Sequence, residues 1–250
     1  MNKAQMPFVL VAGLCLALAG PALAAELPPV EEIFAKHTAA VGGDAIDEVK
    51  TIALEFTFSM AEMGLDTTGE AYMEVPDKSY TLVSLAAMGA GDFEDGTSGS
   101  VAWQNNPQMG YRLLDGIEKT MSLQRARLAP FKDWQDFWAK AETVGEEMVG
   151  EDASYKVVLT HADGGTINVY FDKEEGLVRK QEIPVPQMGS TVTVTPSDYR
   201  AVEGLTMPHR IDQTGPMTIA IVYTDVRINP DDIPEDVFDL PAEVVALTKK

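Results

Sequence analysis

The stretch that decides the fold is residues 155–183, YKVVLTHADGGTINVYFDKEEGLVRKQEI. Apolar and polar residues alternate here as they do in strands that bury one face. The stretch divides into three short segments, residues 155–160, 166–171 and 177–183, and the alternation is clear in the first two. Asp163-Gly164 and Gly176 separate the segments, and such residues supply the positive φ angles that tight hairpin turns need. The stretch therefore predicts an antiparallel meander, which requires further strands on either side to be stable.

The first 24 residues have the pattern of a cleavable signal peptide. Lys3 is followed by an almost unbroken apolar run over residues 7–19, and a small-x-small pattern ends at Ala24. The run is too short for a transmembrane helix, which takes about 20 residues. Cys15 leaves open a second interpretation, a lipoprotein acylated on that thiol. Cleavage after Ala24 predicts a protein exported to a bacterial periplasm, without stable membrane insertion.

Removal of residues 1–24 from the 250-residue chain leaves a single domain of 226 residues, 25–250, without cysteine. A domain of this size can bury an ample core without disulfides. The net charge is −20 for the full chain and −21 after cleavage, because the signal peptide carries one lysine and no acid. This charge excludes nucleic acid as a partner. It favours solubility, and it also suits a carrier that must not adhere to anionic headgroups.

Outward from the meander, short alternating segments predict about eleven antiparallel strands between residues 51 and 226. A helix is expected after Pro28-Pro29, followed by a short second helix that ends at Val49. Residues 87–99 are expected to form a loop, and the tail beyond Pro241 is expected to be loose. Residues 191–195 and 198–202 are expected as separate strands.

The periodicity becomes helical in residues 118–142, and Pro130 divides this region into two expected helices. A helical pair rich in aromatic residues would lie across one face of the sheet. Trp134, Phe137 and Trp138 then have two interpretations, as ordinary helix-to-sheet packing or as the lining of a cavity.

No catalytic or metal-binding pattern is present in the sequence. The three histidines, His37, His161 and His209, do not have metal-ligand spacing, and the mature chain has no cysteine. There is no nucleophile elbow and no phosphate-binding loop. The sequence therefore predicts a non-enzymatic protein without a metal or another cofactor.

Methionine is frequent, with ten residues after the signal peptide. Its flexible, polarisable side chain suits a surface that accommodates varied apolar ligands, although each methionine could equally fill a gap in the core.

Three stretches carry a resemblance to a known family. They are residues 41–51, VGGDAIDEVKT; residues 150–159, GEDASYKVVL, with the turns that follow; and residues 198–208, DYRAVEGLTMP, with Phe238-Asp-Leu-Pro241 near the end. Together they resemble the LolA-like superfamily of exported bacterial proteins, which includes outer-membrane lipoprotein-sorting proteins. The resemblance implies a mainly β fold with some α, an antiparallel unclosed β-barrel whose helices cover the concave face. It also implies a hydrophobic cavity that holds acyl chains.

The resulting expectation is a periplasmic carrier for an acyl chain, a lipid or a lipoprotein. Alternation and position select seven candidate cavity-lining residues: Phe56, Phe58, Met73, Trp103, Trp134, Trp138 and Val169. The alternative is an interaction or sensor module of the cell envelope, with a filled core, a protein partner and no transported ligand. An empty apolar cavity of several hundred Å³ would favour the carrier.

Overall fold

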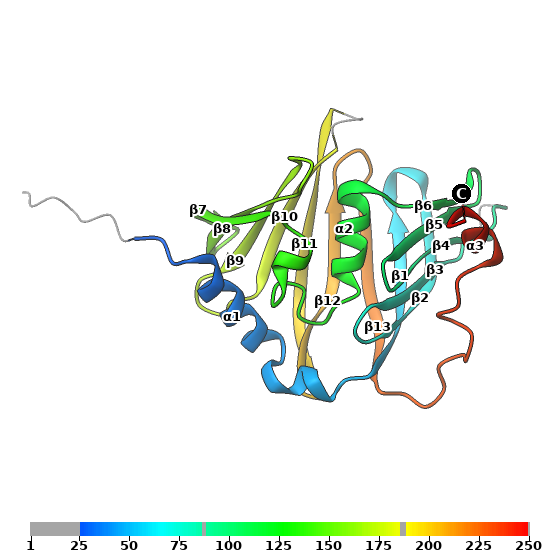
Figure 1. Ribbon diagram of the computed structural model, residues 1–250, viewed down its shortest axis with the longest axis horizontal. Helices are drawn as coiled ribbons and strands as arrows, with labels where there is room; N and C mark the ends of the chain where they lie inside the picture. Colours follow the sequence, from blue (N-terminus) through cyan, green and yellow to red (C-terminus); the bar gives the residue numbers. More distant parts are fainter. Residues whose placement is uncertain (1–25, 87–88, 186–188, 250) are drawn as a thin grey trace, which may run out of the picture.

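The computed structural model describes residues 26–86, 89–185 and 189–249. The expected signal peptide, residues 1–24, lies outside the described residues. Within them the chain forms one antiparallel sheet of 13 strands, in the order β6-β5-β4-β3-β2-β1-β13-β12-β11-β10-β9-β8-β7 (Figure 1). The strands are β1 (Thr51–Met60), β2 (Leu65–Glu74), β3 (Lys78–Val83), β4 (Phe93–Ser98), β5 (Val101–Asn106), β6 (Gly110–Leu113), β7 (Lys140–Val149), β8 (Asp152–Thr160), β9 (Thr166–Asp172), β10 (Val178–Val185), β11 (Ser190–Val202), β12 (Leu205–Thr214) and β13 (Ile219–Ile228).

The sheet is curved but not closed, because β6 and β7 are its two edges and do not pair with each other. The last strand, β13, pairs with the first, β1, so the two ends of the strand series meet in the middle of the sheet. Between them the chain builds one half from β2 to β6 and the other from β7 to β12. The prediction of a mainly β, antiparallel, unclosed sheet of about eleven strands is confirmed, with two more strands than expected.

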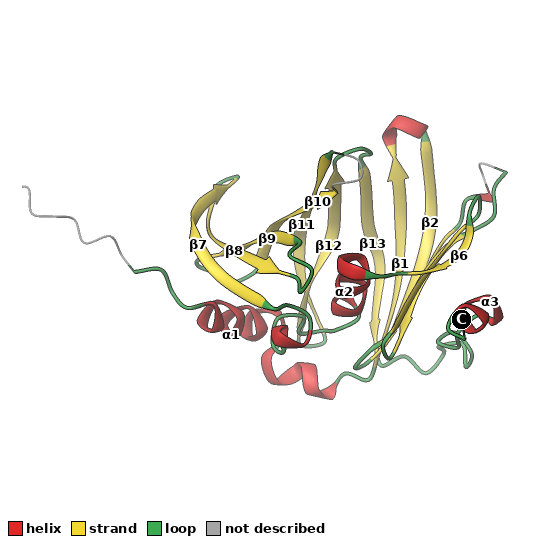
Figure 2. Cartoon of the chain, turned by 45° about the horizontal axis from the view of Figure 1, so that its top comes forward, coloured by secondary structure: helices red, strands yellow, loops and turns green. Residues whose placement is uncertain are grey.

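Helices and short 3₁₀ turns complete the structure. They are α1 (Val30–Val41), η1 (Gly43–Glu48), η2 (Ala61–Met63), α2 (Gly116–Arg125), η4 (Trp134–Asp136) and α3 (Ala242–Leu247). Figure 2 shows the sheet bending around α2, which lies on its concave side.

The residues of α1 explain its position. Val30, Ile33, Phe34 and His37 recur at helical spacing and are all buried. The helix ends at Gly42, which takes a φ of 151° and donates its backbone N–H to the carbonyl of Thr38. This apolar stripe places α1 against the half of the sheet that contains the 155–183 meander.

Two core clusters lie on the concave face. The first cluster joins α1, residues 131–138 and the strands of the meander: Val30, Ile33, Phe34, Phe131, Trp138, Val157, Leu159, Ile167, Val169, Phe171 and Val178. The second cluster lies near the start of β1 and the end of β13: Val49, Ile52, Leu54, Leu205 and Ile228. In each cluster, every second residue of the strands is apolar and packs against a helix or a 3₁₀ turn. The sequence pattern predicted this for the meander.

The expected helical pair of residues 118–142 is half wrong. Only its first member forms, as α2, which ends at Arg125. Residues 131–138 contain a single 3₁₀ turn, η4, and the chain enters β7 at Lys140, before the expected start at residue 146. The aromatic residues of this segment have helical spacing in the sequence, but in the structure they pack into the first cluster from an irregular backbone.

Three further expectations are corrected. The expected loop at residues 87–99 contains strand β4, in which Phe93 pairs with Val83 and Thr97 is buried. The two strands expected around residue 197 are one strand, β11, which continues through the positive φ of Asp198. The tail beyond Pro241 forms α3, where Val244 is completely buried.

Candidate ligand-binding face

An apolar row crosses the middle of the concave face. Phe58 of β1 is directly opposite Ile221 of β13, which is directly opposite Ile211 of β12. Directly opposed residues of an antiparallel pair project from the same face of the sheet, and Phe58 is on the same face as Ile52 because they are six residues apart in one strand. We call Phe58, Ile221 and Ile211 the apolar row. All three are half-buried, whereas Ile52 has no exposed surface.

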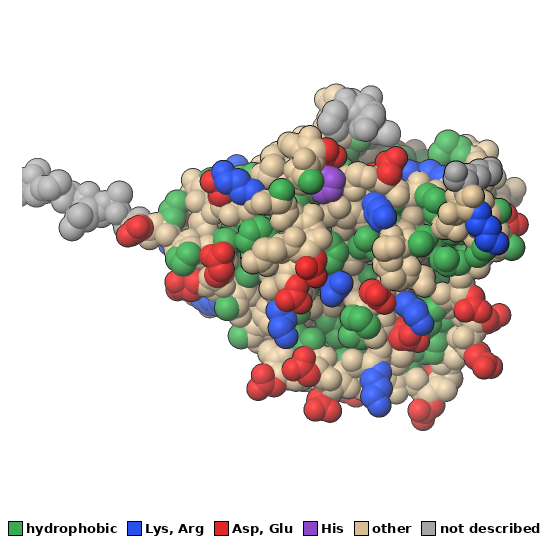
Figure 3. Space-filling view, in the orientation of Figure 1, with side chains coloured by type: hydrophobic (Ala, Val, Ile, Leu, Met, Phe, Trp, Pro, Cys, Tyr) green, Lys and Arg blue, Asp and Glu red, His purple; other side chains and the backbone are tan. Residues whose placement is uncertain are grey.

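The row continues toward the second cluster through a pair of aromatic rings. Phe56 is opposite Tyr223, and their ring centroids are 6.0 Å apart at an interplanar angle of 83°. On its other side Phe56 is opposite Gly69 of β2. The concave face therefore carries partly accessible apolar surface between its two filled clusters. In Figure 3, hydrophobic side chains appear in several patches across the visible face, with charged side chains of both signs between them.

Helix α2 lies across this face and is fixed to the segment that follows it. Ile117 and Met121 pack against the first cluster. The buried amide of Gln124 accepts a hydrogen bond from Trp138 Nε1 at 3.1 Å and donates one to the carbonyl of Pro130 at 2.8 Å. These two bonds connect the end of α2 to residues 126–138. We call α2 and this segment together the α2 cover.

A hollow of about 340 Å³ opens beside the end of α2. Its lining comes from the β2–β3 turn, the β4–β5 turn, α2 and the segment after it: Asp77, Gly99, Ser100, Leu123, Arg127, Asp136 and Phe137. The volume is within the usual range for small-molecule sites, about 300–1,000 Å³. Its lining is mixed, with three charged side chains beside two large apolar ones, and so it is not the wholly apolar cavity expected from the resemblance.

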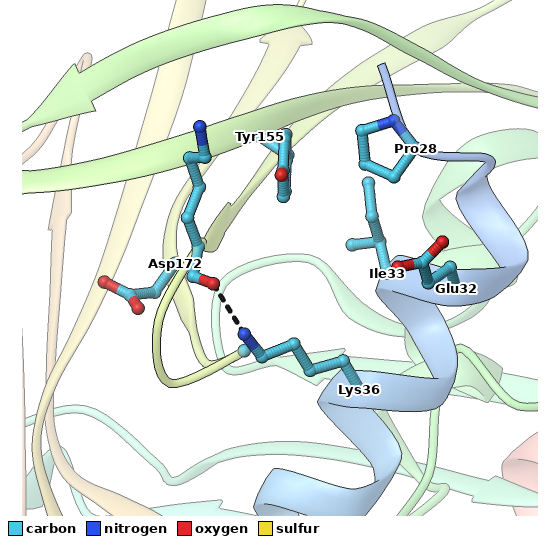
Figure 4. Close-up of a pocket in the computed structure, with 8 residues that line it drawn as sticks. Pro28, Glu32, Ile33, Lys36, Tyr155 and Asp172 are labelled. Carbon is cyan, nitrogen blue, oxygen red and sulfur yellow. Dashed lines mark hydrogen bonds between the residues drawn. The ribbon is translucent and has the colours of Figure 1, made fainter. Parts of the chain in front are cut away.

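A second and smaller pocket, of about 90 Å³, lies where α1 meets the meander (Figure 4). Ile33 and Lys36 approach it from α1, and Tyr155 and Asp172 from the sheet. Lys36 Nζ donates a hydrogen bond to the carbonyl of Lys173 at 2.5 Å. The pocket is too small for an acyl chain, and its polar contacts fasten the helix to the sheet.

His37 lies in the same contact between α1 and the sheet, and it is 5% exposed. Burial lowers its pKa to about 4, against a smaller opposing effect of the hydrogen bond between Nδ1 and the carbonyl of Gly176 at 2.9 Å. The ring is therefore neutral at neutral pH, with Nδ1–H as the donor. It packs edge-on against Phe131 and Phe171, which is a structural role.

Six of the seven predicted lining residues lie on or under the concave face, but they do not surround one cavity. Trp138 and Val169 are buried in the first cluster, and Trp134 packs against it. Met73 packs against the second cluster. Phe56 and Phe58 lie between the two, at the apolar row.

Trp103 lies on the opposite face. Its neighbour Ala102 pairs with Thr97, which pairs with Ser79, which pairs with Met73 of the concave face, so Trp103 points the other way. There it packs against other aromatic rings, with centroids 6.2 Å from Tyr80 and 5.8 Å from Tyr111. Trp103 is therefore removed from the predicted lining.

The methionines also fail to form one surface. Met73 and Met207 pack against the second cluster and Met121 against the first. Met63, Met109, Met148 and Met217 are exposed. Met63 and Met217 lie on adjacent turns, since Thr218 N–H donates to Glu62 Oε2 at 3.2 Å, whereas Met109 and Met148 lie in the β5–β6 turn and on the edge strand β7. Met88 and Met188 lie outside the described residues. The methionines of the described residues therefore do not all lie on one surface.

Other features bear on the class of site. In residues 26–86, 89–185 and 189–249, no three His, Cys, Asp or Glu side chains gather as they would around a metal ion. No helix in the same ranges has the length and apolar character needed to cross a membrane. The residues that sequence reasoning missed are Arg127, Asp77 and Asp136 of the hollow, which carry no motif and meet only through the tertiary fold.

Comparisons with known proteins show which solved structures share this fold. No protein-family model and no curated protein matches the chain. Among solved structures, a LolA superfamily protein from Nitrosomonas europaea aligns with a TM-score of 0.59 and 13% identity, covering 86% of this chain and 99% of that protein. A DUF1329 family protein from Desulfovibrio piger aligns with a TM-score of 0.58 and 12% identity, covering 85% and 98%.

A domain from Vibrio parahaemolyticus with a proposed role in outer-membrane lipoprotein sorting aligns with a TM-score of 0.57 and 12% identity, covering 84% of this chain and 95% of that domain. The TM-scores of these three alignments show a shared fold, whereas identities of 12–13% say nothing about the ligand. The chain has the LolA-like fold, and the resemblance inferred from its turns and strands is confirmed at that level.

Proposed function

We propose that this protein binds an acyl chain of a lipid or lipoprotein on its concave face and carries it through the periplasm, without catalysis. The observation that supports this most directly is the apolar row, in which Phe58, Ile221 and Ile211 lie half-buried in the middle of a sheet. A domain of this size can bury three large apolar side chains fully. Their partial exposure leaves a surface on which a flexible apolar ligand can lie.

The energetics of such binding are favourable. Each methylene group that leaves water contributes about 0.8 kcal/mol. A chain of ordinary length can therefore offset the cost of association, which is roughly 4–15 kcal/mol. The α2 cover, in which Gln124 connects the helix to the segment after it, would shield the bound chain from water. The likeness to a domain with a proposed role in lipoprotein sorting supports the same class of ligand.

Two substitutions in one strand test the proposal with a matched control. Ile221→Asp places a carboxylate in the apolar row, whereas Val222→Asp places the same group one residue along β13, on the opposite face. Both positions are half-buried. With a fluorescent fatty acid as probe, we expect Ile221→Asp to weaken binding by at least about tenfold and Val222→Asp to leave it nearly unchanged, since tenfold corresponds to only about 1.4 kcal/mol. Equal effects of the two variants would contradict binding on the concave face.

A second experiment separates the carrier from the envelope interaction module. Lipids are extracted from the protein purified from its native periplasm and identified by mass spectrometry. Recovery of a lipid in stoichiometric amount supports the carrier. Recovery of no lipid, together with no fatty-acid binding, would contradict the carrier proposal. It would favour an interaction module whose concave face binds a protein partner.

A further inference from the structure

The hollow beside α2 carries charges of both signs in a small volume. Arg127 lines it together with Asp77 and Asp136, and its volume is about 340 Å³. The three residues come from two segments about 50 positions apart, the β2–β3 turn and the chain after α2. The charges therefore meet because the segment after α2 folds against the strand turns at the end of the sheet.

Arg127 is held in place but lacks an acceptor. Its guanidinium carbon lies 5.2 Å from the centroid of the Phe137 ring, in a cation–π contact. Its Nε is buried and has no hydrogen-bond partner in the described part of the chain. Buried donors are nearly always satisfied, so an arginine that lines a hollow and has an unpaired nitrogen is a candidate to bind an oxygen from outside the chain. The planar guanidinium is the side chain best suited to bind the oxygens of a phosphate group.

Two carboxylates line the same hollow as this guanidinium. Asp77 is half-buried and Asp136 is exposed, and neither forms an ion pair with a described lysine or arginine. A simple anion at Arg127 would be repelled by both carboxylates. A group that carries a phosphate and an ammonium together would satisfy Arg127 with the first and the carboxylates with the second.

We propose that the hollow binds the zwitterionic headgroup of an aminophospholipid, with its phosphate at Arg127 and its ammonium at Asp136 and Asp77. This rests on the proposed function, because the acyl chains of the same lipid would lie on the apolar surface of the concave face. Leu123 and Phe137 give the hollow an apolar side, and Phe137 also packs against the first cluster. The hollow therefore has a charged side and an apolar side, as the junction between a headgroup and its acyl chains requires.

Short-chain soluble lipids test the proposal by calorimetry. The probes are dihexanoyl phosphatidylethanolamine, which is zwitterionic, dihexanoyl phosphatidylglycerol, which is anionic, and dihexanoylglycerol, which has no charge. We expect the native protein to prefer the zwitterionic probe to the uncharged one by about tenfold to a hundredfold, the range for hydrogen bonds to charged groups. Arg127→Gln should abolish that preference and leave the affinity for dihexanoylglycerol unchanged. Arg210→Gln, which removes the same charge from an exposed residue paired with Asp212, is the control and should have no effect.

Asp136→Asn gives an independent signature, and its exposed position makes loss of folding a minor concern. It should weaken binding of the zwitterionic probe and strengthen binding of the anionic one, because it removes a negative charge from the hollow. Equal affinity of the native protein for all three probes, unchanged by Arg127→Gln, would overturn the headgroup site while the carrier function stands. Binding of none of the probes or of a fatty acid would overturn both. Binding of the anionic probe as tightly as the zwitterionic one would overturn the role given to the carboxylates.

Discussion

Phe56 and Gly69 are directly opposed on β1 and β2, and the Phe56 ring occupies the space where a side chain at Gly69 would begin. A Cβ atom built on Gly69 would overlap two atoms of that ring, and it would also lie 2.5 Å from the carbonyl oxygen of Leu82. The ring can turn aside, but the carbonyl belongs to the backbone of the neighbouring strand. The glycine is therefore what allows a large aromatic side chain to lie flat at the edge of the apolar row.

Gly69→Ala is expected to destabilise the protein by about 1–3 kcal/mol, the usual cost of overpacking. Urea unfolding followed by circular dichroism measures this. Gly145→Ala is the matched control, because Gly145 is also in a strand, β7, and has no atom within 4 Å of an added Cβ. A stability loss of the same size in both variants would show that strand glycines as such, and not the Phe56 contact, determine the result.

The burial of His37 predicts a stability that depends on pH. Its pKa falls from 6.5 to about 4 on folding, chiefly because burial disfavours the charged ring. Above pH 6.5 His37 is neutral in both the folded and the unfolded protein, so the free energy of unfolding is not reduced by its titration. As pH falls from 6.5 to about 4, the unfolded chain takes up a proton that the folded one does not, and the free energy of unfolding decreases. At about 1.4 kcal/mol for each pH unit, the loss totals roughly 3 kcal/mol.

Unfolding by urea at several pH values between 7.5 and 4 measures this loss. His37→Gln, which keeps a donor for the carbonyl of Gly176, should show a shallower decline than the native protein over the same range. Thr38→Ala, a change one residue along α1 that leaves His37 in place, is the control and should show the native slope. Parallel curves for the native protein and His37→Gln would mean that the ring is not held neutral by burial.

Glu182 presents the opposite case on β10. Burial alone would raise its pKa, but hydrogen bonds from Asn168, Lys180 and Tyr170 lower it to about 2. The distances from the donors are 3.0 Å for Asn168, 2.8 Å for Tyr170 and 2.8 Å for Lys180. Because this pKa is depressed, the stability that Glu182 contributes is present above its ordinary value of 4.5 and is lost as pH falls toward 2.

Carbon-detected NMR of the glutamate carboxyl carbons should find Glu182 still ionised at pH 3.5. Tyr170→Phe removes one donor and should raise its pKa measurably. Tyr155→Phe, a tyrosine on the concave face of the neighbouring strand, should not change it. A pKa near 4.5 for Glu182 in the native protein would refute the network.

The sequence was informative where alternation was long and uninformative where position depends on distant contacts. The meander of β8 to β10 is visible because β8 and β9 each have three or more alternating apolar residues, and turn residues separate the three strands. Strand β4 is polar, Phe93-Glu-Asp-Gly-Thr-Ser98, and becomes a strand because β3 and β5 pair with it on both sides. Pairing of this kind is invisible in a single segment.

The same distinction separates the candidate residues. Phe56 and Phe58 lie in a ten-residue strand whose alternation fixed their face. Trp103 lies in a segment too short to show which face is inward, and its direction is set by the register Gly96 to Trp103. Arg127 could not be found at all, because a lone arginine after a helix becomes a candidate only when the turns at Asp77 and Ser100 meet it.

Helix α3 was missed for the same reason, and it offers a further test. Its six residues look like an ordinary tail, yet Val244 has no exposed surface and the helix lies against β6. Val244→Ala should therefore destabilise the whole domain by about 2 kcal/mol, in line with other losses of buried methyl groups.

Val245→Ala changes the adjacent, half-buried valine and should reduce the free energy of unfolding by clearly less. Both values come from urea unfolding followed by tryptophan fluorescence, to which Trp103 contributes. If Val244→Ala unfolds at the same urea concentration as the native protein, α3 is not part of the cooperative core, and the original expectation of a loose tail is restored.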